Sequence, residues 1–410
     1  MSAAAAAPTS LFVFPSDLVD ETPELVFARA RDKGQVDGLT IAANYHEARD
    51  LFPHNPRRRL SLIRGGTLFV SDARTAATRV GRTCRRGASA SGPESFAGLV
   101  SSCRLAGLRA DGWLNLCHLD NPEAPADVLC RNAFGDPDYA TLCPSHPDTA
   151  RFADALVSDT AASGVGRVVV EALQFAPIVH GFHHERWFTP VSELGAYLLG
   201  LCFCEHCRTG AASLGADVEC LAAGVRTAVD DDLDGEPAHR PLTADALVEL
   251  LGDDLALLWR HRQRAVADLV AVVAAAARRH RAELCVVESS GAVRGYLTGR
   301  PTGEAGPLPP WRFGFDAAEV AALVDEIAIL AYAKERSRVT AEIAASKKAL
   351  AGKATLGVIL RPGPPDCAGA EELAARVALA HSAGASSIAF YHYGLLPLAS
   401  LAWIGAALSA

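Results

Sequence analysis

The chain has 410 residues, of which half are apolar and 21% are charged. This composition excludes an intrinsically disordered chain, and the length allows two average domains or one large α/β barrel. The net charge of −8 argues against nucleic acid as a partner. No window reaches ~18 uninterrupted apolar residues, and the Ala-rich start lacks the basic region of a signal peptide. We therefore expect a cytoplasmic protein without a membrane partner, whose eleven cysteines are mostly reduced thiols.

Eight short apolar runs rich in β-branched residues alternate with longer amphipathic segments. Alternation of strand and helix is typical of a parallel sheet, and eight repeats predict a closed (β/α)8 TIM barrel. The expected strands are Leu11–Phe14, Gly38–Ala43, Trp113–His118, Arg167–Leu173, Leu284–Glu288, Glu326–Tyr332, Thr355–Arg361 and Ser387–His392. Helical periodicity follows each of the last four strands, in Asp316–Val324, Lys334–Ala351, Ala370–Gly384 and Pro397–Leu408.

We expect residues 1–410 to form a single barrel domain with long insertions after the second and fourth strands. Residues 47–95 are predicted to form a β-hairpin and loop, because two strand-like runs flank Gly65 and Gly66. Residues 174–245 are predicted to form a loop and helical insertion that carries Cys and His residues. A helical segment from about Thr243 to Arg281 follows, and its apolar stripe is expected to pack on the barrel through Leu247, Leu250, Leu251, Leu255, Leu258 and Val266.

Two glutamates at expected strand ends are the candidate catalytic residues, because chemistry in this fold collects where the barrel strands end. Glu171 interrupts an apolar strand and shares a face with Val169, and Glu288 repeats the arrangement on the next strand. Adjacent strands are ~5 Å apart, so both carboxylates are expected in one cavity at a separation that glycosidases use. The alternative is that each glutamate is only an ion-pair partner of Arg361 or Arg167.

Polar and aromatic residues at the other strand ends are expected to orient a sugar, since aromatic rings stack on pyranose faces and polar groups bind hydroxyls. These candidates are Asn44, His118, Asp120, Tyr332, Arg361, Tyr391 and His392. The loop after the fourth strand adds His183, His184 and Glu185 as substrate contacts. A structural hydrogen-bonding role is the alternative for this loop.

Two clusters have residue types that bind metals. Cys202, Cys204 and Cys207 lie within six residues, a spacing that suits structural zinc and equally suits three buried reduced thiols. The fourth ligand that a tetrahedral zinc site needs is expected from His206, Cys143, Cys220 or a histidine of the preceding loop. The second cluster, which could hold a catalytic metal, consists of His180, His183, His184 and Glu185.

Several segments resemble a group of bacterial (β/α)8 proteins described as glycosyl hydrolases, which are similar to alpha-amylase-like and family-10-like glycosidases. The matching segments are Phe52–Arg59, Asn132–Asp136, Leu142–Pro147, His180–Glu185 and Leu201–Cys207, and the likeness extends from about Leu11 to Leu408. The resemblance implies a barrel with a carbohydrate site.

Within that resemblance, the alpha-amylase superfamily places its nucleophile at the end of the fourth strand and its general acid at the end of the fifth. These positions match Glu171 and Glu288. This chain departs from the superfamily in having Glu rather than Asp at 171, and Arg361 where a third carboxylate is usual.

The sequence therefore predicts a glycoside hydrolase that acts on a carbohydrate with two carboxylates and needs no cofactor for its chemistry. One alternative is a metal-dependent hydrolase that uses His180, His183, His184 and Glu185. The other is a carbohydrate-binding barrel without turnover, since this fold hosts many functions.

Overall fold

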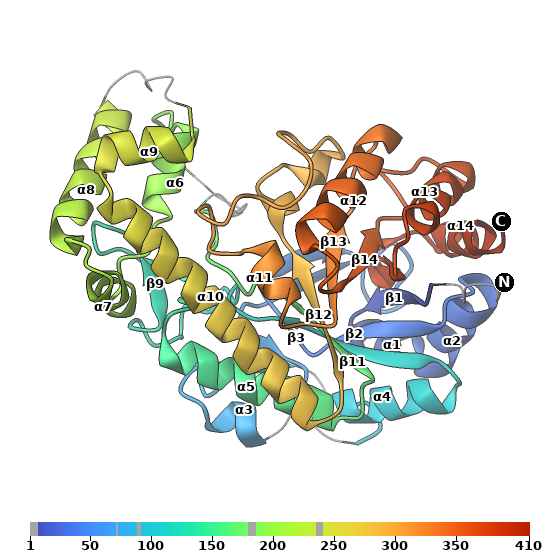
Figure 1. Ribbon diagram of the computed structural model, residues 1–410. Helices are drawn as coiled ribbons and strands as arrows, with labels where there is room; N and C mark the ends of the chain where they lie inside the picture. Colours follow the sequence, from blue (N-terminus) through green and yellow to red (C-terminus); the bar gives the residue numbers. More distant parts are fainter. Residues whose placement is uncertain (1–6, 71–72, 88–91, 179–185, 235–240) are drawn as a thin grey trace.

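Eight parallel strands close into a barrel in a computed structural model that describes residues 7–70, 73–87, 92–178, 186–234 and 241–410 (Figure 1). Each barrel strand pairs with the strand that follows it in the barrel, and the last pairs with the first. The barrel strands are β1 (Thr9–Val13), β2 (Gly38–Ala42), β8 (Arg109–Asn115), β11 (Arg167–Glu171), β12 (Glu283–Glu288), β13 (Glu326–Leu330), β14 (Thr355–Leu360) and β15 (Ser387–Phe390). The predicted (β/α)8 barrel is confirmed, and each strand overlaps its expected segment.

Helices cover the outside of the barrel (Figure 1). The four predicted helices of the second half correspond to α11 (Ala317–Ala321), α12 (Arg336–Leu350), α13 (Ala370–Ser382) and α14 (Leu398–Ser409). The first half contributes α1 (Pro15–Glu21), α2 (Pro23–Ala28), α3 (Ala73–Ala77), α4 (Phe96–Leu105) and α5 (Pro147–Ala162). Short helical turns occur in both halves, namely η1 (Arg29–Lys33), η2 (Ser290–Ala292), η3 (Tyr296–Thr298) and η4 (Tyr393–Leu395). None of the described helices combines the length and apolar character needed to cross a lipid bilayer.

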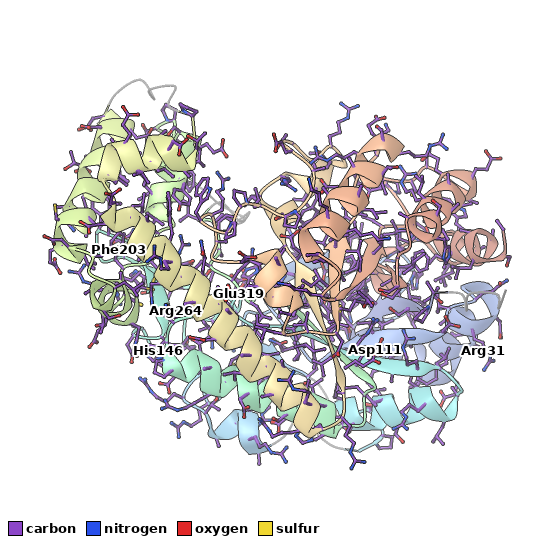
Figure 2. The ribbon with its side chains drawn as sticks, in the orientation of Figure 1. Arg31, Asp111, His146, Phe203, Arg264 and Glu319 are labelled. Atoms are coloured by element: carbon purple, nitrogen blue, oxygen red, sulfur yellow. The ribbon has the colours of Figure 1, made fainter. Side chains whose placement is uncertain are left out.

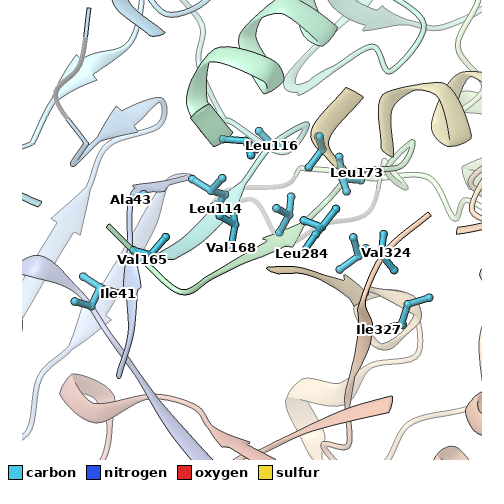
Figure 3. Packing of buried hydrophobic residues seen from close by; sticks show 14 of the residues in the cluster. Ile41, Ala43, Leu114, Leu116, Val165, Val168, Leu173, Leu284, Val324 and Ile327 are labelled. Atoms are coloured by element: carbon cyan, nitrogen blue, oxygen red, sulfur yellow. The ribbon is translucent and has the colours of Figure 1, made fainter. Parts of the chain in front are cut away.

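Alternation along the strands divides the apolar residues between two layers. Outward-facing residues such as Leu114, Val168, Leu284 and Ile327 pack against the helices in one continuous cluster (Figure 3). Inward-facing residues form a separate cluster that fills the barrel, including Phe12, Trp113, Val169, Cys285, Val287, Ala328 and Ile359. A residue's position in this alternation therefore decides whether it can reach the mouth of the barrel.

A buried ionic network occupies the N-terminal end of the barrel, opposite the mouth. Arg167 donates to Glu326 at 2.7 Å and to Asp111 at 3.1 Å, and Ser387 donates to the same Glu326 oxygen at 2.9 Å. Asp111 has no exposed side-chain surface and lies within the barrel in Figure 2. Because these charges are removed from water together, each depends on the others for compensation.

The insertion after β2 does not form the predicted hairpin across Gly65 and Gly66. β5 (Leu60–Ile63) pairs with β4 (Ala48–Leu51), whereas β6 (Thr67–Leu68) pairs with β3 (Asn44–Tyr45) and β7 (Arg85–Arg86). A Cβ atom on Gly65 would lie 1.5 Å from the carbonyl oxygen of Asp120. The glycine is thus required where the insertion passes close to the third βα loop, which is the segment that follows β8. It does not mark a turn between paired strands.

The insertion after β11 forms a helical lobe, defined as α6 (Glu193–Leu199), α7 (Glu205–Ser213), α8 (Val218–Asp234), α9 (Ala244–Leu251) and the first turns of α10 (Asp254–Arg279) (Figure 1). The predicted helix from Thr243 to Arg281 is broken at Gly252, whose φ is 80°. The expectation that its apolar stripe packs on the barrel is wrong for Leu247, Leu255 and Leu258, which join the core of the lobe. Val266 alone of these buried stripe residues packs in the barrel cluster.

Two antiparallel strands, β9 (Leu129–Arg131) and β10 (Pro137–Leu142), lie in the third βα loop beside the lobe. Phe203, labelled in Figure 2, belongs to the lobe core, and its backbone N–H donates to the carbonyl oxygen of Arg131. The lobe is therefore attached to the barrel through α10 and through this loop.

Candidate active site at the barrel mouth

The strand ends surround a cavity of about 440 Å³, within the usual range for small-molecule sites. Its walls are strongly aromatic, and its polar lining comes from several different strands and loops. The aromatic rings are those of Phe12, Phe175, Phe313, Tyr45, Trp113, Tyr296, Tyr332 and Tyr391. The polar side chains are His46, Asn115, His118, Glu171, Gln174, Ser289, Arg361 and His392. A cavity with these walls suits a ligand that has both apolar faces and polar edges.

Glu171 lies at the end of β11 and lines this cavity, as the sequence predicted. Its Oε1 accepts a hydrogen bond of 3.1 Å from the side-chain amide of Asn115. Burial raises the pKa of Glu171 to about 7, against the opposing effects of the charge on His46 and the hydrogen bond from Asn115. A carboxyl group in this state can hold a proton near neutral pH and release it to a ligand.

Glu288 does not reach the cavity of Glu171, so the expected pair of carboxylates in one cavity is wrong. The register pairs Val170 with Val286, which places Glu171 level with Val287. Glu288 is one residue further along, so its side chain points to the helix side of the barrel wall. There its Oε1 accepts hydrogen bonds from the backbone and side chain of Ser290. Burial raises the pKa of Glu288 as well, but in a small space of about 20 Å³ between β12 and α12.

Neither glutamate is an ion-pair partner of Arg167 or Arg361, which was the alternative interpretation. Arg167 belongs to the network at the opposite end of the barrel. Arg361 donates to both carboxylate oxygens of Asp366, at 2.8 and 3.0 Å, and to the carbonyl oxygen of Tyr296. Its guanidinium lies 4.8 Å from the ring centroid of Tyr332. Arg361 therefore lines the cavity with a guanidinium group that its bonds to Asp366 and Tyr296 hold in place.

Two histidines and an aspartate form a group beside Glu171. His118 and Asp120 are 3.0 Å apart, and the imidazole rings of His46 and His118 stack with centroids 4.3 Å apart. Burial lowers the pKa of His46, but the hydrogen bond and charge of Asp120 outweigh it and raise the pKa overall. Burial lowers the pKa of His118 more than Asp120 restores it. Ligand atoms of all three residues lie within 4.8 Å of one another, so this group could also hold a metal ion.

Three buried polar atoms on lining residues have no hydrogen-bond partner, namely Nε1 of Trp113, Oδ1 of Asn115 and Nε2 of His392. His392 has no exposed surface, and its Nδ1 accepts from the backbone N–H of Gly394 at 3.2 Å, which leaves Nε2 as the protonated nitrogen without an acceptor. Burial lowers the pKa of His392 to about 3, so the ring is neutral. Asn115 is 3% exposed, and no donor bonds to its Oδ1 atom. Two donors and one acceptor are thus left for a ligand in the cavity.

Most predicted substrate contacts that the structure describes lie at the cavity, but not all. His118, Tyr332, Arg361, Tyr391 and His392 line it, and Asp120 lies behind His118. Asn44 is an exception, because its side chain bonds to the backbone N–H and carbonyl of Asn115 and does not line the cavity. The predictions for His180, His183, His184 and Glu185 fall outside the described residues.

Several lining residues were absent from the predicted site. Tyr45, whose hydroxyl lies 3.0 Å from that of Tyr391, belongs to the short strand that follows β2. Trp113 and Ser289 lie on the inward-facing side of β8 and just beyond β12. Every second residue of a strand faces inward, so Cys285 and Val287 predict that Ser289, and not Glu288, faces the cavity just beyond β12. This alternation was the signal that could have identified Ser289.

Four cysteines meet between the third βα loop and the lobe. Cys143 follows β10, and its sulfur lies 3.8 Å from that of Cys202, 3.5 Å from that of Cys204 and 3.6 Å from that of Cys207. All four thiols are buried, and their sulfur atoms lie within 4.8 Å of one another. Sulfur atoms bound to one tetrahedral zinc ion at ~2.3 Å would be about 3.8 Å apart. The cluster fits zinc in ligand type, number and spacing.

Of the residues considered as a fourth ligand, the structure brings Cys143 to the other three thiols. Cys220 is exposed on α8. The ring of His206 packs edge-on against His146, with centroids 4.4 Å apart. Cys143 is 59 residues from Cys202 in the sequence, so local spacing could not select it.

Comparisons with known proteins identify the fold. No family model matches the chain, and no curated protein matches it. The catalytic domain of a beta-amylase from Paenibacillus polymyxa is similar in structure, with a TM-score of 0.53 and 10% sequence identity over 96% of this chain and 94% of that one. Beta-galactosidases from Marinomonas ef1 and Bacillus circulans sp. alkalophilus are similar, each with a TM-score of 0.51 and 10% identity. The alignment spans 59% and 50% of the two galactosidase chains. At this identity the likeness is one of fold, a (β/α)8 barrel that glycoside hydrolases also have.

Proposed function

We propose that this protein hydrolyses glycosidic bonds and that Glu171 is its general acid. The observation that carries the proposal is a carboxyl group with a pKa raised to about 7, aimed into an aromatic cavity at the barrel mouth. The unpartnered atoms of His392 and Asn115 support it, because sugar hydroxyls both donate and accept hydrogen bonds. The fold of the beta-amylase and the beta-galactosidases is consistent with this reaction class.

In the proposed reaction a single carboxyl group, that of Glu171, carries out both proton transfers. Protonated Glu171 donates its proton to the glycosidic oxygen as the bond from that oxygen to the anomeric carbon breaks. A water molecule then forms a bond to the anomeric carbon, and the Glu171 carboxylate takes the proton that the water releases. The carboxyl group is thereby restored, and the products are the leaving alcohol and the free sugar.

The test compares Glu171→Gln with wild type on a panel of aryl glycosides and oligosaccharides. Loss of a general acid lowers the rate by about 100- to 10,000-fold. The loss should be greatest for sugar leaving groups and smallest for nitrophenols, which leave without protonation. Glu288→Gln is the matched control, because this glutamate faces away from the cavity, and it should retain activity. Equal turnover by Glu171→Gln and wild type on oligosaccharides would refute the assignment.

Metal-dependent hydrolysis is the second candidate, and the ligand geometry of His46, His118 and Asp120 favours it. Chelation would then abolish turnover and added metal would restore it. A glycosidase of the proposed kind keeps its turnover under chelation that leaves the protein folded, which thermal unfolding of the same sample checks. A binding protein without turnover would bind oligosaccharides and leave every member of the panel intact.

We further propose that Cys143, Cys202, Cys204 and Cys207 hold a structural zinc ion. The support is the match between their sulfur spacing and a tetrahedral site, together with their complete burial. The ion would join the third βα loop to the helical lobe. Metal analysis of protein purified without added zinc should find one zinc ion per chain, and folded protein without zinc would contradict the proposal.

A further inference from the structure

A second compartment of about 410 Å³ adjoins the cavity of Glu171. It lies between the helical lobe and the fifth βα loop, which is the segment that follows β12. Its walls include Tyr197 of α6 and Arg262 of α10. Four residues line both spaces, namely Ala176, Pro177, Val293 and Phe313. A ligand bound beside Glu171 can therefore extend into this compartment.

Arg262 carries a buried guanidinium group at this compartment. The residue is 1% exposed, and its Cζ lies 4.4 Å from the ring centroid of Phe175. Its Nε and Nη1 atoms have no hydrogen-bond partner. The ring of Phe175 compensates this buried charge in part, but two N–H donors still lack acceptors, which costs stability unless a ligand supplies them.

The described neighbouring groups leave two nitrogens of Arg262, Nε and Nη1, without an acceptor. Across the described ranges of the chain, Arg262 forms no ion pair with a carboxylate. The hydroxyl of Tyr197 interacts with Arg262, and it also accepts from the indole N–H of Trp259 at 2.8 Å and donates to the carbonyl oxygen of Trp311 at 3.0 Å, so Nε and Nη1 of Arg262 stay without a partner. Among the described residues, Nε and Nη1 of Arg262 therefore have no acceptor.

A second guanidinium, that of Arg312, lines the same compartment. Its Cζ lies 5.5 Å from the ring centroid of Trp311 and 5.9 Å from that of Tyr197. One of its nitrogens pairs at 3.1 Å with Glu193, whose side chain is 73% exposed, and its Nε has no partner. Two guanidinium groups face one largely solvated carboxylate, so the described walls carry excess positive charge.

We propose that this compartment binds the carboxylate of a sugar acid, so that the substrates are glycans that contain a uronate. The inference rests on the proposed glycosidase function and adds its substrate class. A guanidinium group presents parallel N–H donors that match the two oxygens of a carboxylate. The aromatic rings around Arg262 and Arg312 suit the apolar face of the same sugar ring.

The test measures binding of matched methyl glycosides to the Glu171→Gln protein by calorimetry. Methyl glucuronide is compared with methyl glucoside, and methyl galacturonide with methyl galactoside, because each pair differs only at the carboxylate. We expect at least one uronate to bind at least tenfold tighter than its neutral partner. That preference should disappear when Arg262→Gln is added. It should persist with Arg264→Gln, a change at an exposed position of the same helix (Figure 2).

Thermal unfolding separates a binding role of Arg262 from a structural one. If its charge is uncompensated without ligand, Arg262→Gln should unfold at a temperature equal to or above that of wild type. A large decrease would show that the guanidinium serves the fold, and would overturn the proposal. Arg312→Gln provides a second, independent comparison of uronate and neutral sugar, and a uronate preference that is unchanged in this variant would also count against the site.

The other outcomes distinguish this proposal from the proposed function. Equal binding of uronate and neutral sugars, absence of uronate binding, or a preference that survives Arg262→Gln overturns the sugar-acid site. Tighter binding of methyl glucoside 6-sulfate than of either uronate overturns the assignment to a carboxylate. Uronate preference without turnover of any uronate-containing oligosaccharide leaves the binding site standing and refutes the hydrolase.

Discussion

The side-chain amide of Asn115 donates a hydrogen bond of 3.1 Å to the carboxyl group of Glu171. The two residues are paired in register at the ends of β8 and β11. A donor to a carboxylate favours the ionised form, so Asn115 lowers the pKa that burial raises. The balance leaves the pKa of Glu171 at about 7, where a carboxyl group can act as both acid and base near neutral pH.

Asn115→Ala should shift the pH dependence of catalysis. Removal of the hydrogen bond raises the pKa of Glu171 further, so the protonated acid persists to higher pH and the alkaline limb of kcat/KM moves upward. A purely structural role for Asn115 would lower the rate equally at every pH. Asn132→Ala, at a turn outside the cavity, is the control and should leave the profile in place. An unshifted limb in Asn115→Ala would contradict this account of the site.

Glu171→Gln should change how stability depends on pH. The folded state keeps the proton of Glu171 up to a pKa of about 7, whereas the unfolded chain loses it near 4.5. Folding therefore binds a proton in this window, and the free energy of unfolding of wild type falls as pH rises through it. Glutamine has no such proton, so the variant should gain stability relative to wild type between pH 5 and pH 8, roughly the limits of this window. Urea unfolding at the two pH values measures the difference, and parallel curves would refute the raised pKa.

Cys143→Ser should release the proposed zinc ion and lower the unfolding temperature. One thiolate of four is lost, and the remaining buried thiols lack the ion that links the loop to the lobe. Cys220→Ser is the matched control, because this thiol is exposed and lies apart from the cluster. Metal content and thermal unfolding are measured on the same samples. Equal metal content in the two variants would show that Cys143 is not a ligand.

Arg167→Ala should destabilise the barrel by about 3–5 kcal/mol, because it leaves buried carboxylates of Asp111 and Glu326 without their partner. The matched control is Arg31→Ala, which removes a surface ion pair with Asp32 and should leave stability unchanged. Chemical unfolding at neutral pH gives both values. A loss in Arg167→Ala as small as in the control would mean that water already solvates the network. Figure 2 labels Asp111, a partner of Arg167 in this network, and Arg31, the control position.

The barrel could be predicted from the sequence because its signals are local. Each strand is a run of β-branched residues followed by a segment with helical periodicity, and each expected strand overlaps an observed one. The placement of Glu171 also followed from local alternation with Val169, since both are inward-facing neighbours on one strand. In the insertions, local patterns do not specify which neighbour a strand or an apolar helix face meets, and the predicted hairpin at Gly65 and the packing of Leu247 were wrong.

The relation between the two glutamates could not be predicted from either strand alone. Both end a run of valines, but the register of β11 against β12 sets Glu171 level with Val287 and turns Glu288 outward. A shift of one residue in this register would have reversed the outcome. Register depends on how the closed barrel packs, and that information is spread over all eight strands.

The sequence by itself determined the class of fold, the glutamate at the end of the fourth strand and the three clustered cysteines, because each is written in neighbouring residues. Only the tertiary structure decided that Cys143 completes the thiol cluster, that Glu288 leaves the cavity, and that Arg262 lies unpaired beside it. The physical reason is that metal geometry, strand register and charge compensation join residues distant in the chain. Their positions are set when the barrel closes and the helical lobe packs against it.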